Sequence, residues 1–151
     1  MLDSAAMQDL YQEIILDHYR SPRNRGPGAP GAHEAHHSNP LCGDELTVRV
    51  ALEGDAVGEV TWEGQGCSIS QASASMMSEA VRGLSPAAAQ ELVEKLRRMM
   101  HGEPPDEDLG DAMALEGVAR YPVRVKCALL AWMALRDALA RAGYAAPKEE
   151  S

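Results

Sequence analysis

The stretch Leu46-Thr47-Val48-Arg49-Val50-Ala51-Leu52 alternates between large apolar side chains and side chains that are polar or small. This period of two predicts a half-buried β-strand, because successive side chains of a strand point to opposite faces. A turn at residues 53–56 and a second apolar run at residues 57–62 predict a return strand, so that the two segments form a hairpin. We expect this hairpin to form part of an antiparallel sheet.

On the N-terminal side of the hairpin, apolar side chains at helical spacing predict a helix over residues 6–20. We expect the polar end of this helix, residues 17–20, to be solvated. Residues 22–31 are rich in glycine and proline and predict a loop. The three histidines at positions 33, 36 and 37 favour a short edge strand over a metal site.

On the C-terminal side of the hairpin, three further helices are expected. The first follows Ser68-Ile69-Ser70-Gln71, which matches a capping box, the second begins at Ser85, and the last begins at Tyr121. Between the last two helices we expect an acidic, solvated loop over residues 103–111. A short helical turn is expected within residues 109–117.

Composition limits the class of protein. The chain has 151 residues, 45% of them hydrophobic and 25% charged, which is typical of a globular protein with a real core. We expect one domain over residues 1–145 and a disordered tail over residues 146–151. The net charge of -9 argues against nucleic acid or an anionic membrane as a partner. The N-terminus has no signal-peptide pattern, so we expect a cytoplasmic protein.

The three cysteines each lie at a turn or near a helix start. Cys42 is separated from Asp44 by one glycine, Cys67 lies between the hairpin and a helix, and Cys127 lies in the second turn of the last helix. An odd number of cysteines in a reducing compartment disfavours disulfides. Three thiolates and a carboxylate could form a tetrahedral zinc site or an incomplete iron–sulfur ligand set. Spacing alone leaves open the alternative of three independent buried thiols.

Several motifs, in order along the chain, together resemble the U-type iron–sulfur cluster assembly scaffold family, the IscU and SufU proteins, which are related to the N-terminal part of NifU. The matching residues are Tyr11, Asp17-His18-Tyr19, Pro22-Arg23-Asn24, Asn39-Pro40-Leu41-Cys42-Gly43-Asp44, Gly64-Gln65-Gly66-Cys67, the run from Ser68 to Met77, and Arg124-Val125-Lys126-Cys127. The resemblance covers nearly the whole chain. It implies an α+β fold, SufE/NifU-like, with a three-stranded antiparallel sheet, helices packed on one face, and a metal site at one end.

The resemblance also implies the roles of the site residues. Zinc would be held by Cys42, Asp44, Cys67 and Cys127, and Cys42 would accept persulfide sulfur, with Arg124 tied to the same site. The IscU branch has a histidine immediately before the third cysteine, where this chain has lysine at position 126, and the segment between the second and third cysteines is longer here. Both features resemble the SufU branch. His18, Tyr19 and Arg23 also match the family, and a docking role for this region is a hypothesis.

The leading hypothesis is therefore a zinc-containing sulfur acceptor that takes sulfur from a cysteine desulfurase of the SufS or IscS type. Such a protein is a sulfurtransferase-like partner rather than a stand-alone enzyme, and it would pass sulfur to a cluster scaffold or to apo-proteins. The alternative is a scaffold on which a transient [2Fe–2S] cluster is built and transferred. A zinc hydrolase would need an open metal position, and no HExxH pattern is present. A purely structural zinc domain predicts that Cys42→Ala unfolds the protein.

Overall fold

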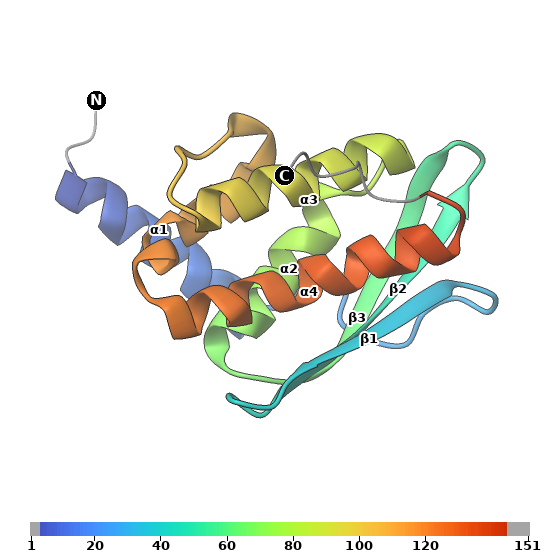
Figure 1. Ribbon diagram of the computed structural model, residues 1–151, viewed down its shortest axis with the longest axis horizontal. Coiled ribbons are helices and arrows are strands. Elements are labelled where there is room, and N and C mark those ends of the chain that lie inside the picture. The colour runs from blue at the N-terminus through green and yellow to red at the C-terminus, as the bar shows by residue number, and fades with distance from the viewer. Residues whose placement is uncertain (1–3, 145–151) are drawn as a thin grey trace.

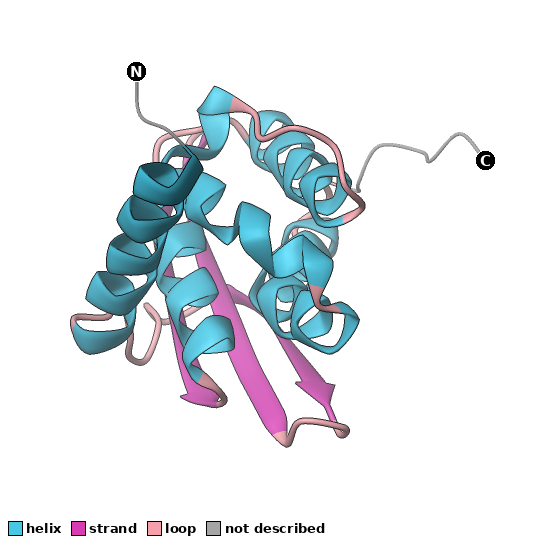
Figure 2. Cartoon of the chain, turned by 90° about the vertical axis from the view of Figure 1, so that its left-hand side faces the viewer, coloured by secondary structure: helices cyan, strands magenta, loops and turns pink. Residues whose placement is uncertain are grey.

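The computed structural model describes residues 4–144, and it confirms the α+β fold. Three antiparallel strands, β1 (His33–Asn39), β2 (Asp44–Glu53) and β3 (Ala56–Gln65), lie in the order β1-β2-β3. The helices gather against one face of this sheet (Figures 1 and 2). They are α1 (Ser4–Arg20), α2 (Ser68–Ala80), α3 (Pro86–Met100), the 3₁₀ segment η1 (Glu107–Arg120) and α4 (Pro122–Arg141). None of the helices described is long and apolar enough to span a membrane.

The predicted hairpin is confirmed as β2 and β3. Val48 pairs with Trp62 and Val50 pairs with Val60, and the register shifts between Val50 and Leu52. The side chains of Leu46, Val48 and Val50 are fully buried, as the alternation predicts. The residues between them are only partly covered, because they lie on the opposite face of the sheet.

The core lies between the sheet and the helices that cover it. Helix α4 packs across β1 and β2 and also against α2, and α2 in turn packs against α1 (Figure 1). Trp62 and Trp132 are the largest fully buried side chains. The Trp132 indole donates to Ser73 Oγ at 2.9 Å, and Ser73 donates to the Ala128 carbonyl at 2.6 Å. Helices α2 and α4, which carry two of the three cysteines, are therefore bonded to each other in the core.

Each outer edge of the sheet has backbone groups that are bonded by another part of the chain. Along β3, the loop after α1 forms a short bridge to Trp62, with bonds from Gly26 N to Trp62 O at 2.9 Å and from Trp62 N to Asn24 O at 3.2 Å. Along β1, the guanidinium of Arg141, the last residue of α4, donates to the Glu34 carbonyl at 2.7 Å. The short edge strand that was predicted at the three histidines is confirmed, because these residues lie in β1.

The predicted capping box is wrong. The N-cap of α2 is Cys67, one residue earlier than expected, and no side chain of the N-cap residue bonds the helix amides. Gln71 instead donates from Nε2 to the Gly66 carbonyl at 2.8 Å, and Ser70 Oγ donates to the Cys67 carbonyl at 3.0 Å. The Cys67 amide is bonded by a carboxylate from β2, so a residue distant in sequence takes the place of a local cap.

Two expectations of solvation are also wrong in part. His18 is fully buried, although its neighbours Asp17 and Tyr19 are exposed. The segment predicted as a solvated loop contains the first part of η1, where Leu109 is fully buried, so the expected helical turn begins earlier and is longer. The single domain over residues 1–145 stays a prediction. The tail predicted from residue 146 lies outside the described residues.

Candidate metal centre

The connection between β1 and β2 places Cys42. The last pair of the β1–β2 ladder joins Asn39 to Asp44, and the four residues between them form the loop. The Cys42 amide donates to the Asn39 carbonyl at 3.1 Å, and Gly43 has a φ of 70°, a conformation that glycine adopts without steric cost. Cys42 is therefore carried on a tight loop, partly exposed, immediately before the strand that begins with Asp44.

Asp44 binds the start of α2 to the sheet. Its carboxylate is buried, with 2% of the residue exposed, and Oδ1 accepts from the Cys67 amide at 3.0 Å. The second oxygen, Oδ2, lies 3.6 Å from Cys67 Sγ. A Cβ on Gly66 would lie 3.3 Å from this carboxylate and 2.2 Å from Ser70 Oγ, so the chain approaches Asp44 closely only because position 66 has no side chain.

The third cysteine, Cys127, is supplied by helix α4. Cys127 is buried in the second turn of α4, and its Sγ lies 3.5 Å from Cys42 Sγ and 3.7 Å from the Val123 carbonyl. Burial away from water raises the pKa of the Cys127 thiol, and the hydrogen bond to Cys42 raises this pKa further. A cation at this point would favour the deprotonated thiol.

Three of the donor atoms lie close enough together to share a metal. The ligand atoms of Cys42, Asp44 and Cys127 all lie within 4.8 Å of one another, whereas Cys67 is outside this group and contacts it through Asp44. In a zinc site with ordinary bond lengths, two sulfurs are about 3.8 Å apart and a sulfur and an oxygen about 3.5 Å apart. The observed separations are 3.5 Å between the Cys42 and Cys127 sulfurs and 3.6 Å between Cys67 Sγ and Asp44 Oδ2. Three soft sulfurs and one carboxylate also match the ligand preference of zinc.

Arg124 and Lys126 lie beside this centre without contacting it. Both side chains are exposed, and the described residues give Arg124 no side-chain hydrogen bond or ion pair. Arg124 lines a shallow hollow with Ser68, which follows Cys67, and with Tyr121. Lys126 lines a separate hollow on the side of β1. The structure therefore places the Arg124 side chain in a hollow that also includes Ser68, the residue after Cys67.

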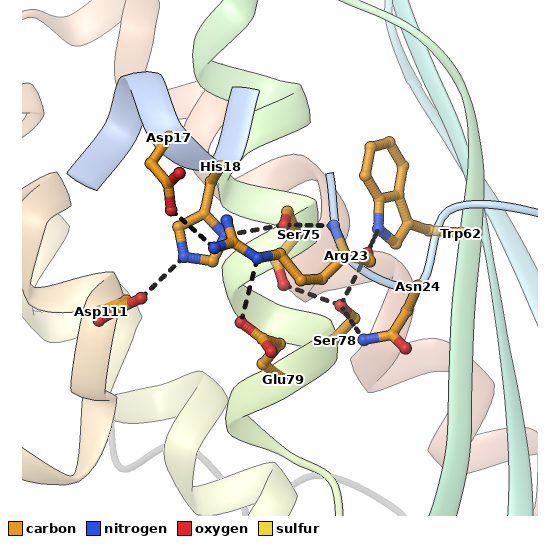
Figure 3. Close-up of polar contacts among 9 residues, drawn as sticks. All are labelled: Asp17, His18, Arg23, Asn24, Trp62, Ser75, Ser78, Glu79 and Asp111. Carbon is orange, nitrogen blue, oxygen red and sulfur yellow. Dashed lines mark hydrogen bonds and ion pairs between the residues drawn. The ribbon is translucent and has the colours of Figure 1, made fainter. Parts of the chain in front are cut away.

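A second polar cluster, which the sequence does not reveal, lies around His18 (Figure 3). Its Nδ1 is 2.7 Å from Ser75 Oγ and its Nε2 is 2.8 Å from Asp111 Oδ2. Ser75 Oγ also accepts from the Arg23 amide at 2.8 Å. The simplest assignment of protons has Ser75 donating to Nδ1 and Nε2–H donating to Asp111, which leaves every group paired.

Arg23 belongs to the same cluster. Its guanidinium donates to Asp17 at 2.6 Å and lies 3.8 Å from Glu79, and its backbone carbonyl accepts from the Trp62 indole at 2.8 Å (Figure 3). The hydrogen bond to Arg23 holds the pKa of the Asp17 carboxyl below its usual value. The ligand atoms of His18, Glu79 and Asp111 also lie within 4.8 Å of one another. Because a guanidinium contacts Glu79 and both His18 nitrogens are paired, we interpret the cluster as a structural network.

The histidines of β1 form no such group with other ligands in the described residues. His36 Nδ1 bonds Thr47 Oγ1 at 2.9 Å, and His37 Nε2 bonds Asp137 at 2.5 Å. The structure thus agrees with the interpretation of this stretch as a strand.

Comparison with known proteins identifies the family. The model of the NifU-like N terminal domain matches residues 10–141. The chain belongs to the NifU-like N-terminal domain family. This NifU-like chain is 41% identical to the zinc-dependent sulfurtransferase SufU of Bacillus subtilis, over 91% of this chain and 95% of the relative. It is 37% identical to the iron–sulfur cluster assembly scaffold protein IscU of Streptococcus pyogenes, over 92% and 88% of the two chains.

A solved structure with the same fold supports this assignment. The crystal structure of an iron–sulfur cluster assembly scaffold protein for the SUF system, from Fervidobacterium islandicum AW-1, has a TM-score of 0.79 and 36% sequence identity to this NifU-like chain. The comparison covers 87% of this chain and 98% of that one. The predicted resemblance to the SufU and IscU proteins is confirmed.

Proposed function

We propose that this NifU-like chain is an iron–sulfur cluster assembly protein that accepts persulfide sulfur on Cys42 at a zinc site. The observation that carries the proposal is the convergence of the Cys42 and Cys127 sulfurs with the Asp44 carboxylate, which the Cys67 sulfur also contacts, with Cys42 on a loop. A relative that is 41% identical is named a zinc-dependent sulfurtransferase, which supports the same chemistry.

The residues that would hold the metal are Cys42, Asp44, Cys67 and Cys127. When bound, zinc keeps the thiolates deprotonated and unreactive until one of them is released. Asp44 begins β2 and Cys127 lies within α4, and Cys67, which follows Gly66, is the N-cap of α2 with its amide bonded to Asp44. Cys42 lies in the loop between β1 and β2, next to Gly43, so we infer that it is the ligand that can leave at least cost to the fold.

Cys42 then performs the transfer. Its thiolate attacks the outer sulfur of a cysteine persulfide on the partner, forming a new sulfur–sulfur bond on Cys42. The sulfur–sulfur bond of the partner breaks, and its cysteine leaves as a thiolate with the electron pair. No external oxidant or reductant is needed. Arg124, exposed one helical turn before Cys127, could swing to stabilise the negative sulfur at the vacated position.

The donor in this proposal is a cysteine desulfurase of the SufS or IscS type, and the acceptors are a cluster scaffold or apo-proteins. We therefore assign the chain as a sulfur-transfer partner of that enzyme. The side chain at position 126 argues against the alternative, a scaffold that binds a stable cluster. The lysine side chain offers hydrogen-bond donors and no acceptor, unlike the histidine of the IscU branch, which favours transfer over stable cluster binding.

The second candidate function is a scaffold for a transient [2Fe–2S] cluster. It is favoured by the relatives named as scaffold proteins, including the 37% identical IscU of Streptococcus pyogenes. Three cysteine ligands and a carboxylate could bind such a cluster. After anaerobic reconstitution, a stable visible absorption band with stoichiometric iron and sulfide would favour this candidate.

One paired experiment tests the proposal. Metal and labile sulfide are measured on the purified protein, and turnover of a cysteine desulfurase is measured with wild type, with Cys42→Ala and without the chain. We expect one zinc per chain, stimulation by wild type, and loss of stimulation in the mutant with its thermal unfolding still cooperative. Iron and sulfide in equal amounts with little stimulation would contradict the proposal, and an unfolded Cys42→Ala would indicate a purely structural site.

A further inference from the structure

Asn39 directs both ends of its side chain into the loop that carries Cys42. It is the last residue of β1, and only 8% of it is exposed. The carboxamide oxygen accepts from the Leu41 amide at 3.2 Å, and the carboxamide nitrogen donates to Cys42 Sγ at 3.6 Å. The backbone carbonyl of the same residue accepts from the Cys42 amide. One residue therefore fixes both the shape of the loop and the direction of the sulfur.

The bond to sulfur is more than the turn requires. A turn of this kind needs only the side-chain oxygen, which an aspartate would supply equally well. The nitrogen is an additional donor, and in the described part of the chain it is the only nitrogen donor to Cys42 Sγ. The Cys127 thiol is a weaker sulfur donor to the same atom at 3.5 Å, and the nearby Asp44 carboxylate disfavours a negative charge there. A hydrogen bond to an ionised acceptor is stronger than one between neutral groups.

We propose that Asn39 is a positioning residue for sulfur transfer at Cys42. Its carboxamide holds the sulfur in one direction and stabilises the negative charge that this sulfur carries when it attacks. Asn39 touches neither the partner nor the transferred sulfur, and it acts through Cys42. The kinetic consequence rests on the proposed function, whereas the hydrogen bond itself can be tested without any sulfur transfer.

Three variants separate the two ends of the side chain. Asn39→Asp keeps the oxygen that accepts from Leu41 and loses the nitrogen donor, with nearly the same shape. Asn39→Ala loses both ends without adding a charge. Ser38→Ala is the matched control, because Ser38 is the exposed neighbour of Asn39 on β1. Thermal unfolding of each variant reports whether the loop and the strand remain folded.

The kinetic readout is persulfide formation on Cys42, followed by mass spectrometry after alkylation, at varied concentrations of a cysteine desulfurase. We expect Asn39→Asp and Asn39→Ala to lower the maximal rate by about tenfold, as the loss of a charge-assisted hydrogen bond implies. The desulfurase concentration that gives half of the maximal rate is expected to be unchanged. A merely structural role would change that concentration or the unfolding temperature instead.

The spectroscopic readout uses cobalt(II) bound in place of zinc. Removing a donor from a cobalt-bound thiolate raises the energy of the sulfur lone pairs, so the sulfur-to-cobalt absorption should move to longer wavelength in both variants and not in Ser38→Ala. Unchanged rates and unchanged spectra in folded Asn39→Asp would overturn the proposal. If wild type itself takes no sulfur from the desulfurase, both the proposed function and the kinetic part of this proposal fail. The cobalt spectra would still show whether Asn39 donates a hydrogen bond to the Cys42 sulfur.

Discussion

Asp44 uses its two carboxylate oxygens for two different tasks. Oδ1 accepts from the Cys67 amide, and Oδ2 faces the Cys67 sulfur within the candidate metal centre. Replacement by asparagine would keep an oxygen for the amide and remove the charged ligand. We expect Asp44→Asn to lower zinc affinity by more than the roughly 10- to 100-fold that is typical of changes outside the ligand shell.

Competition with a chelating dye would measure this loss of zinc affinity. Glu45→Gln is the matched control, because Glu45 is the next residue of β2 and is exposed. Equal affinity in Asp44→Asn and wild type would show that the carboxylate is not a ligand.

At the scale of residues, the sequence predicts which side chains form the candidate metal centre but not the hydrogen bonds that orient them. The resemblance implied four ligands, and the structure gathers the donor atoms of Cys42, Asp44 and Cys127, with Cys67 in contact with Asp44. The bonds that orient them could not be predicted, because the Asp44–Cys67 bond joins residues 23 positions apart. Asn39 is different. Its partner is only three residues away, so the short motif from Asn39 to Cys42 already contains a signal for this contact.

At the scale of elements, the His18 network joins three segments that are far apart in the sequence. His18 lies on α1, Ser75 on α2 and Asp111 on η1. We expect His18→Ala to lower the free energy of unfolding by about 2–4 kcal/mol, because it opens a cavity and leaves Ser75 without this partner. The zinc content of the folded protein is expected to stay at the wild-type level.

Urea unfolding would measure this change. His36→Ala is the control, since His36 is an exposed histidine on the sheet and its loss should cost no more than about 0.5 kcal/mol. A cost for His18→Ala as small as that of the control would mean that the network contributes nothing to stability.

The spacing of α1 contained a signal for the burial of His18. Ile14 and Ile15 belong to the apolar stripe, and His18 follows one turn later on the same side of the helix. Ser75 and Asp111 are 57 and 93 residues away from it, so no local pattern could name these partners. The capping box failed for a related reason: a carboxylate on β2 bonds the amide of Cys67, the N-cap of α2, so a long-range contact replaces the expected local one.

At the scale of the whole molecule, three large apolar side chains are exposed around the cysteine site. We call Leu41, Tyr121 and Val123 the apolar rim; they are 79%, 63% and 64% exposed. Leu41 precedes Cys42, and the Val123 carbonyl accepts from the Cys127 thiol. Exposed Arg124 and Lys126 flank the rim, although the chain as a whole has a net charge of -9. Apolar side chains beside local positive charge suit a protein partner with an acidic, partly apolar face.

We therefore expect the double variant Leu41→Asp, Val123→Asp to weaken binding to the cysteine desulfurase by at least about tenfold, since exposed apolar anchors at a contact centre often carry its affinity. Titration by calorimetry would measure this, with zinc content as a check on the site. Leu10→Asp is the control, because Leu10 is 45% exposed on α1 and does not line the hollow that α1 forms with Tyr121. Equal weakening by the control would contradict a specific role for the rim.

The covered edges of the sheet limit how any partner can recognise this molecule. A strand with free backbone amides and carbonyls invites a foreign strand to extend the sheet, which leads to peptide capture or to aggregation. Here the loop after α1 occupies part of the β3 edge, and Arg141 occupies the Glu34 carbonyl on the β1 edge. A strand added at either of these points would have to displace the bonds that are already there. Recognition that leaves them in place depends on side chains, so its specificity can change by substitution without any change of the backbone.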